Sequence, residues 1–218
     1  MAANVKGSRN YDGSGRQART RLTRVAVIES ARELFLQLGY AATTIEAISD
    51  QSGTPQATIY RIFSSKLGIL RALLDVAAVG DDQEIAMGDR PQVRGLLGQQ
   101  DPRAQLMGFA GLARKVMSRL APVHRILLSA AGSDPDAAAL LVEHTRQRQE
   151  GQARIAKSLA RAKALRPKLR ERDAADIIHA LMSPEVYLLL VSDRDWSPER
   201  YEQWLGQTLI DQLLPLGS

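Results

Sequence analysis

Among all segments of the chain, the residues from Thr54 to Lys66 have side chains whose types and spacing most clearly indicate a binding surface. They read Thr54-Pro55-Gln56-Ala57-Thr58-Ile59-Tyr60-Arg61-Ile62-Phe63-Ser64-Ser65-Lys66. Gln side chains pair bidentately with adenine, Arg side chains pair with guanine, and small apolar groups contact the thymine methyl. Hydroxyl groups and lysine ammonium groups bind phosphate oxygens. Such side chains on one side of a short helix are typical of a surface that reads double-stranded DNA.

The spacing places these side chains on a helix. Ile59 and Phe63 are four residues apart and point to one side. Thr54 followed by Pro55 is the usual pair of N-cap and first helical residue. The opposite side of the helix then presents Gln56, Ala57, Tyr60 and Arg61.

Two helices are expected before this one. The first, within residues 24–38, has its apolar residues three and four apart, at Val27, Ile28, Ala31, Leu34, Phe35 and Leu38. Gly39 follows and suits a left-handed helix end. Thr43 with Glu46 fits a capping box for a short second helix, which Gly53 ends. Two short helices joined by a tight turn form a helix-turn-helix, whose second helix enters the DNA major groove.

Residues 24–74 resemble the N-terminal domain of the TetR family of bacterial transcriptional regulators. The resemblance rests on an alanine-containing first helix ending in Leu-Phe and Gly-Tyr, followed by Thr-Thr-Ile, Gly, Ile-Tyr, Phe and Ser-Lys. It implies an all-α fold, with a three-helix DNA-binding domain followed by a helical domain for ligand binding and dimerisation. It also implies DNA contacts at Thr43, Thr44, Thr54, Pro55, Gln56, Ala57, Thr58, Tyr60, Arg61 and Lys66. Of these, Thr44, Tyr60 and Lys66 would bind phosphates, and Gln56, Ala57, Thr58 and Arg61 would face bases.

Two positions depart from the family pattern, and several candidates have a simpler interpretation. Ile62 stands where many relatives have a polar residue. Gly68 lies early in the fourth helix, where glycine costs about 1 kcal/mol relative to alanine, and we expect it to ease tilting of that helix. Tyr60 could cover the edge of the core, Thr43 and Thr44 could act only as caps, and Lys66 could be a solvated charge.

The distribution of charge agrees with DNA binding. Residues 1–66 hold nine basic and five acidic residues, which accounts for +4 of the net charge of +5. A basic segment on an otherwise balanced chain indicates a polyanionic partner. We predict a disordered basic arm at 1–19, a helix-turn-helix domain at 20–66, and a helical effector-binding and dimerisation domain at 67–218.

The remainder of the chain is predicted to be helical. We expect helices at about 66–80, 102–120, 122–132, 134–165, 173–190 and 198–213, with a loop containing short helical turns at 80–101. Pro184 should kink the helix in which it lies. The last two helices are apolar on several sides, so they would either complete a monomer core or pack on a second copy as a four-helix bundle. The resemblance favours a homodimer through these helices, which suits a pseudo-palindromic operator.

A small-molecule pocket, if present, is expected among the middle helices. Methionines adapt to irregular ligands, and a histidine can anchor a polar group in an apolar cleft. The candidates are Met107, Phe109, Met117, His124, Leu127, His144 and Met182. Each of them could equally be an ordinary core residue.

Composition excludes several other classes of protein. The chain of 218 residues contains no cysteine and three histidines, without metal-ligand spacing, so we expect neither disulfides nor a metal site, and no cofactor. It has no nucleophile–base constellation, which argues against an enzyme. Without a long apolar run, it is expected to be cytoplasmic rather than membrane-bound. The predicted function is a DNA-binding repressor that a small molecule releases from its operator. The alternative is a regulator of the same fold that acts constitutively or through a protein partner.

Overall fold

The computed structural model describes residues 13–80 and 87–215. Within these residues every regular element is a helix and no strand is present. The all-α class predicted from the sequence is confirmed. The basic arm was predicted for residues 1–19, but residues 13–19 form the first turns of the first helix, and residues 1–12 lie outside the described part.

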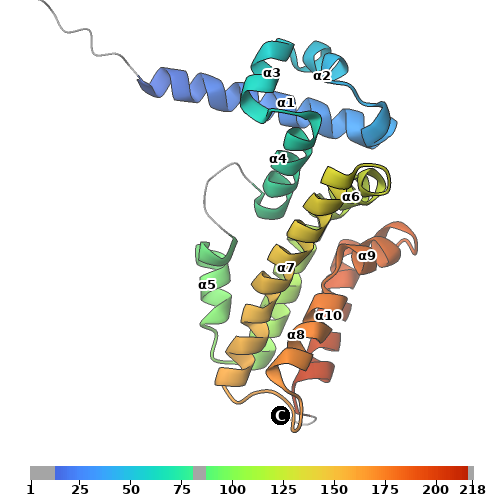
Figure 1. Ribbon diagram of the computed structural model, residues 1–218. Coiled ribbons are helices and arrows are strands. Elements are labelled where there is room, and N and C mark those ends of the chain that lie inside the picture. The colour runs from blue at the N-terminus through green and yellow to red at the C-terminus, as the bar shows by residue number, and fades with distance from the viewer. Residues whose placement is uncertain (1–12, 81–86, 216–218) are drawn as a thin grey trace, which may run out of the picture.

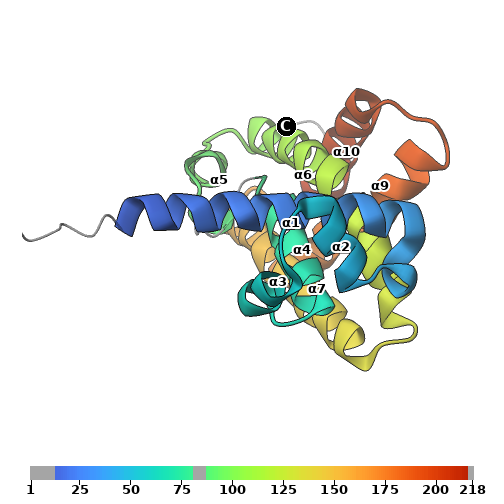
Figure 2. The same ribbon diagram turned by 90° about the horizontal axis from the view of Figure 1, so that it is seen from above.

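The first four helices occupy one end of the molecule (Figure 1). They are α1 (Gly13–Ala42), α2 (Ile45–Ser52), α3 (Gln56–Phe63) and α4 (Lys66–Val79). We call α1, α2 and α3 the head. Seen from above, α1 crosses over the rest of the chain (Figure 2). α4 leads from the head toward the remaining helices.

The head has its own apolar core. Most of the side chains predicted to point inward are at most 8% exposed, namely Val27, Ile28, Ala31, Leu34, Phe35, Ile48, Ile59 and Phe63. Leu38 is an exception, because it is 54% exposed. Gly39, at φ 80° and ψ 164°, kinks α1 instead of ending it in the left-handed helical conformation that the sequence predicted, and the helix resumes to Ala42.

Two helix starts differ from the predicted caps. The hydroxyl of Thr44, not that of Thr43, caps α2 by accepting a hydrogen bond from the Ala47 backbone N–H over 3.1 Å. Thr43 is fully buried, and its hydroxyl instead donates to the Gly39 carbonyl. α3 begins at Gln56 without a side-chain cap, so Thr54 does not fill the role that its place before a proline suggested.

The remaining helices form the body (Figure 1). They are η1 (Met87–Asp89), α5 (Pro91–Leu97), α6 (Pro102–Ala131), α7 (Pro135–Arg161), α8 (Glu171–Leu181), α9 (Pro184–Tyr187), η2 (Leu188–Ser192) and α10 (Pro198–Leu213). Side chains of Asp134 and Ser197 cap α7 and α10, as their places before prolines predicted. α6 lies at the centre of the body, in contact with α4, α5, α7, α9 and α10.

Pro122 does not divide the helix in which it lies. The sequence predicted one helix ending near residue 120 and another beginning at Pro122, but α6 continues through both. A proline removes one backbone hydrogen bond within a helix. Tertiary packing outweighs that loss, because residues 120, 121, 123, 124, 126 and 127 beside the proline are all buried.

Pro184 has the opposite effect. The sequence predicted one kinked helix over residues 173–190, whereas the chain breaks at Met182 and Ser183 and a new helix starts at Pro184. Glu171–Leu181 and Pro184–Ser192 meet at 40°. Among the described residues no single helix has the length and hydropathy of a membrane span, although this bent pair reaches that threshold by length and composition alone.

α4 joins the head to the body. Leu70, Leu73 and Leu74 are at most 2% exposed and form the inward face of this helix. The Arg71 guanidinium donates a hydrogen bond to the Glu143 carboxylate on α7 over 2.7 Å. The Arg119 Nε on α6 donates to the Ala77 carbonyl near the end of α4. Apolar packing and two polar contacts therefore hold α4 against α6 and α7 of the body.

Gly68 has a steric role that the sequence did not indicate. A Cβ atom at this position would lie 1.9 Å from the Phe63 carbonyl oxygen, which belongs to the last turn of α3. The backbones of α3 and α4 approach each other so closely that only glycine fits. The structure thus gives Gly68 a close-packing role, and the expectation that it eases tilting of α4 stays a prediction.

Candidate nucleic-acid interface

The turn between α2 and α3 has a defined conformation. Gly53 ends α2 with φ 62° and ψ 18°, a left-handed conformation that glycine adopts without a steric penalty. The Ser49 hydroxyl donates to the Thr54 carbonyl over 2.8 Å. These features set the angle between the two helices, and the fully buried Ile59 anchors α3 in the head core.

The outward face of α3 carries most of the predicted contacts. Pro55, Gln56, Ala57, Tyr60 and Arg61 are exposed. The Tyr60 side chain is 50% exposed, which is unusual for a large aromatic side chain. The structure therefore places Gln56, Ala57 and Tyr60 on one accessible surface of α3.

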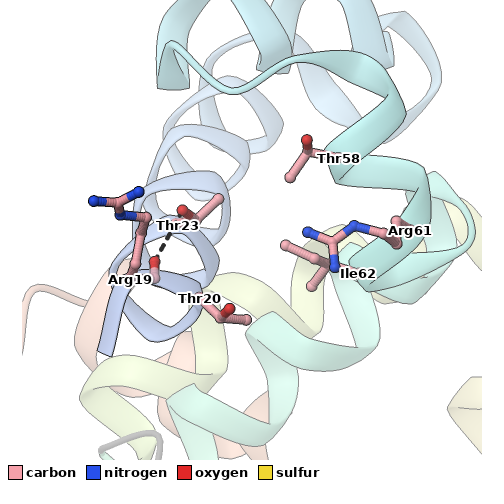
Figure 3. A pocket seen from close by; sticks show the side chains of 6 residues that line it. All are labelled: Arg19, Thr20, Thr23, Thr58, Arg61 and Ile62. Carbon is pink, nitrogen blue, oxygen red and sulfur yellow. Dashed lines mark hydrogen bonds between the residues drawn. The ribbon is translucent and has the colours of Figure 1, made fainter. Parts of the chain in front are cut away.

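A hollow of about 310 Å³ separates α1 from α3 (Figure 3). Its lining consists of Arg19, Thr20, Thr23, Thr58, Arg61 and Ile62. The guanidinium of Arg61 extends across α3 toward α1, and Arg19 lies at the rim (Figure 3). In Figure 3 the Arg61 guanidinium is directed at the recess and that of Arg19 points away from it, so the Arg61 guanidinium and the threonine hydroxyls are the groups that suit an anion such as a DNA phosphate.

Sequence reasoning missed the α1 side of this hollow. Arg19, Thr20 and Thr23 were assigned to the arm or left without a role, because residues 1–19 lack apolar periodicity. Their spacing of three and four, continued to Val27, was a signal that α1 extends toward the N-terminus. The extended helix brings a second element beside the recognition helix.

Lys66 is directed into the protein rather than toward the surface of α3. Its ammonium group donates hydrogen bonds to the carbonyls of Tyr40 at 2.7 Å, Thr43 at 2.8 Å and Ala41 at 3.4 Å. It also lies 4.4 Å from the centre of the Tyr40 ring. Burial lowers the pKa of this lysine, despite the nearby carboxylate of Asp134. A lysine has three N–H donors, and these contacts occupy all of them.

The four threonines of the predicted DNA set have different environments. Thr44 is exposed beside the start of α2, where it already serves as a cap. Thr43 and Thr54 are buried at 0% and 6% exposure. Thr58 is partly exposed and lines the hollow. Thr44 and Thr58 thus remain accessible, whereas Thr43 and Thr54 are core residues of the head.

The candidates for a ligand pocket fall into three groups. Phe109, Met117 and Leu127 are at most 3% exposed and belong to the apolar core. Met107 is 38% exposed, and its sulfur lies 2.4 Å from where a Cβ of Gly206 would be, so it packs on α10. His124 and His144 come together, with ring centroids 6.1 Å apart. Met182 is close to the same polar cluster through its carbonyl, which accepts hydrogen bonds from α7.

Comparison with known proteins agrees with this geometry. Residues 27–73 match the model for bacterial regulatory proteins of the tetR family. The chain is 29% identical over 154 residues to the HTH-type transcriptional regulator TcmR of Streptomyces glaucescens, an alignment that covers 66% of this chain. It spans 62% of the length of that relative.

Solved structures share the fold over most of the chain. NalD, the secondary repressor of the MexAB-OprM multidrug efflux pump in Pseudomonas aeruginosa, superposes with a TM-score of 0.66 at 18% identity, covering 91% of this chain and 99% of NalD. SmeT in complex with triclosan superposes with a TM-score of 0.67 at 18% identity, covering 89% and 93% of the two chains. From the match over residues 27–73, together with the helix-turn-helix in the head, we conclude that the head is a DNA-binding domain of the TetR family of bacterial transcriptional regulators, and the helical body behind it is similar in fold to solved regulators.

Proposed function

We propose that the protein represses transcription by binding a pseudo-palindromic operator as a homodimer, and that a small molecule bound in the body releases it. The exposed face of α3 carries this proposal, because Gln56, Ala57 and Tyr60 form an accessible surface on a helix anchored by the buried Ile59. A helix of eight residues with such a face fits the major groove.

The surface proposed for DNA comprises α3 and the hollow beside it. Gln56 and Ala57 would contact bases, whereas Thr44, Tyr60, Arg61 and Arg19 would bind phosphates on either side. Lys66 is left out of this contact set, since its three donors bind carbonyls of the head. Its contribution would be to hold the last turn of α1 against the start of α4.

Dimerisation is proposed to use α8 and α10. Leu205, Leu209 and Leu213 on α10 are fully buried within one chain, so they complete the core of the monomer. Trp204 and Thr208 on α10, and Ile177 and Leu181 on α8, are only partly covered. Covering these side chains with the same helices of a second copy would form a four-helix bundle.

The head and the body are proposed to have different functions. We propose that residues 20–66 bind DNA and residues 67–218 bind the effector and form the dimer. The chain resembles SmeT, which was solved with triclosan bound, and NalD, which is named a repressor, and both likenesses favour a ligand-responsive repressor.

Selection of bound sequences from random DNA, followed by analytical ultracentrifugation of the complex, tests this function. The expected result is a sequence with two inverted half-sites bound by one dimer. A protein that remains monomeric with and without DNA, or that enriches no sequence, would contradict the proposal. Constitutive binding that responds to no small molecule would support the alternative regulator instead.

A further inference from the structure

All three histidines of the chain converge on one polar cluster in the body. His124 on α6 places Nε2 3.0 Å from the Glu185 carboxylate on α9. His179 on α8 places Nδ1 2.8 Å from the Gln152 side-chain oxygen on α7. The His144 ring, also on α7, neighbours that of His124. Four helices thus contribute polar side chains to one region, which we call the histidine cluster: His124, His144, Arg148, Gln152, His179 and Glu185.

Several polar atoms of the histidine cluster are buried without a partner. They are Nδ1 of His124, Nδ1 of His144 and Nε of Arg148. The His124 side chain is only 1% exposed. A buried polar atom that makes no hydrogen bond destabilises the folded protein, so native structures rarely keep one without a reason. Three such atoms in one cluster indicate a place where another molecule completes the hydrogen bonding.

The charge at the centre of the cluster has no direct ion pair, and the Glu185 carboxylate acts on it only from a distance. Arg148 donates two long hydrogen bonds, to the Met182 carbonyl at 3.5 Å and to Nε2 of His179 at 3.4 Å. Of the carboxylates described in the structure, none forms an ion pair with it, and Glu185 is engaged by His124. A partly buried guanidinium without a carboxylate suits an incoming anion, which it can bind through two parallel hydrogen bonds.

The hydrogen bonding of His124 shows what else a bound molecule must offer. Its Nε2–H donates a hydrogen bond to the ionised Glu185 carboxylate. Burial lowers the pKa of His124, so the ring is neutral and its Nδ1 is an acceptor. A molecule that satisfies both groups needs an anionic acceptor for Arg148 and a hydrogen-bond donor for His124. Glu185 is 53% exposed on its side chain, so this end of the cluster lies near solvent.

We propose that the histidine cluster is the effector site of this protein and that it binds a small organic carboxylate carrying a hydroxyl group. The carboxylate pairs with Arg148, and the hydroxyl donates to Nδ1 of His124, with Nδ1 of His144 as an additional contact. A metal ion is not the occupant, because no group of three or more suitable side chains among the described residues could hold one. This inference rests on the proposed ligand response and specifies its chemistry.

Thermal unfolding with salicylate as the probe tests the site. Salicylate has both groups, whereas salicylamide keeps the hydroxyl without the charge, and benzoate keeps the charge without the hydroxyl. We expect salicylate to raise the unfolding midpoint at millimolar concentration, with an affinity about tenfold or more above those of the two analogues. Equal effects of salicylate and salicylamide, or no effect of salicylate, would overturn the assignment.

Substitution of Arg148 gives a second readout that needs no ligand. Because its partly buried charge forms no ion pair and only two long hydrogen bonds in the free protein, Arg148→Met should leave the unfolding midpoint unchanged or raise it, and should abolish the shift with salicylate. The matched control is Arg146→Met, which breaks an exposed pair with Glu150 on the same helix and should keep the shift. A lower midpoint for Arg148→Met without ligand would make this arginine a structural residue and refute its role as an anion site.

Operator binding separates this inference from the proposed function. If wild type binds its selected operator but no arm of the salicylate series shifts unfolding, the anion site is wrong and the DNA-binding function stands. If salicylate binds as expected but the protein enriches no DNA, the proposed function fails while the anion site holds.

Discussion

The Arg71 guanidinium on α4 and the Glu143 carboxylate on α7 form a hydrogen-bonded ion pair at 2.7 Å, between residues that are 72 positions apart. Glu143 is the neighbour of His144 in the sequence. The same turn of α7 therefore faces the histidine cluster and holds the helix that leads to the head. A molecule that moves this turn would therefore act on α4 through the Arg71–Glu143 ion pair.

Breaking this ion pair should affect coupling more than stability. Arg71→Gln and Glu143→Gln should each lower the free energy of unfolding by about 1 kcal/mol or less, because both side chains are more than a third exposed. A double-mutant cycle on operator affinity should show that the two changes are not additive. If the two changes in operator affinity were additive, and no larger than the change caused by an Arg146→Gln control, the Arg71–Glu143 pair would not couple the body to the head.

Gly68→Ala should destabilise the protein by about 3 kcal/mol or more, since the new methyl group meets the Phe63 carbonyl oxygen at 1.9 Å. Helix propensity alone would predict the opposite sign. The control is Gly151→Ala in α7, where a Cβ would meet no atom within 4 Å, and which should stabilise by about 0.5–1 kcal/mol. Chemical denaturation of both variants measures the difference, and equal stabilisation by the two would contradict the close approach of α3 and α4.

Lys66→Met should lower the free energy of unfolding by about 1–3 kcal/mol, because three backbone carbonyls lose their donor. Arg61→Ala, at an exposed position, should stay within about 0.5 kcal/mol of wild type while weakening DNA binding. Denaturation curves and binding to operator DNA distinguish the two roles. A Lys66→Met protein with wild-type stability and uniformly weaker DNA binding would restore Lys66 as a phosphate contact.

Acid should destabilise the protein through His144. Burial, together with His124 and Arg148 nearby, lowers the pKa of His144 from 6.5 to about 4. Between these values the unfolded chain binds the proton and the folded chain does not, so stability falls as the pH decreases from about 6.5 to about 4. The slope from one such histidine is at most about 1.4 kcal/mol per pH unit. His144→Gln should reduce that slope in unfolding curves measured across this range, and an unchanged slope would show that another group is responsible.

Gln56→Ala should relax base preference at one or two positions of the operator, with a cost of about 1–3 kcal/mol at those positions. Tyr60→Phe should instead weaken binding to all sequences alike, because a phosphate contact carries no base information. Affinities for the operator, for single-base variants and for random DNA provide the comparison. If Gln56→Ala loses the same affinity for operator and random DNA, Gln56 does not read a base.

The sequence by itself determined the features that depend on neighbours along the chain. The three- and four-residue spacing of Ile59 with Phe63, and of Leu70 with Leu73 and Leu74, indicated which helix faces are buried. Ser197 before Pro198 indicated where α10 begins. Periodicity and capping are local properties of a helix, so a single sequence reveals them.

Tertiary structure alone decided the contacts between distant residues. Lys66 binds the Tyr40 carbonyl 26 positions earlier, and His124 meets Glu185 61 positions later. No local pattern encodes such pairs, because which residues meet depends on how whole helices pack. The same packing let α6 continue through Pro122 and brought the α3 backbone so close to α4 that position 68 must be glycine.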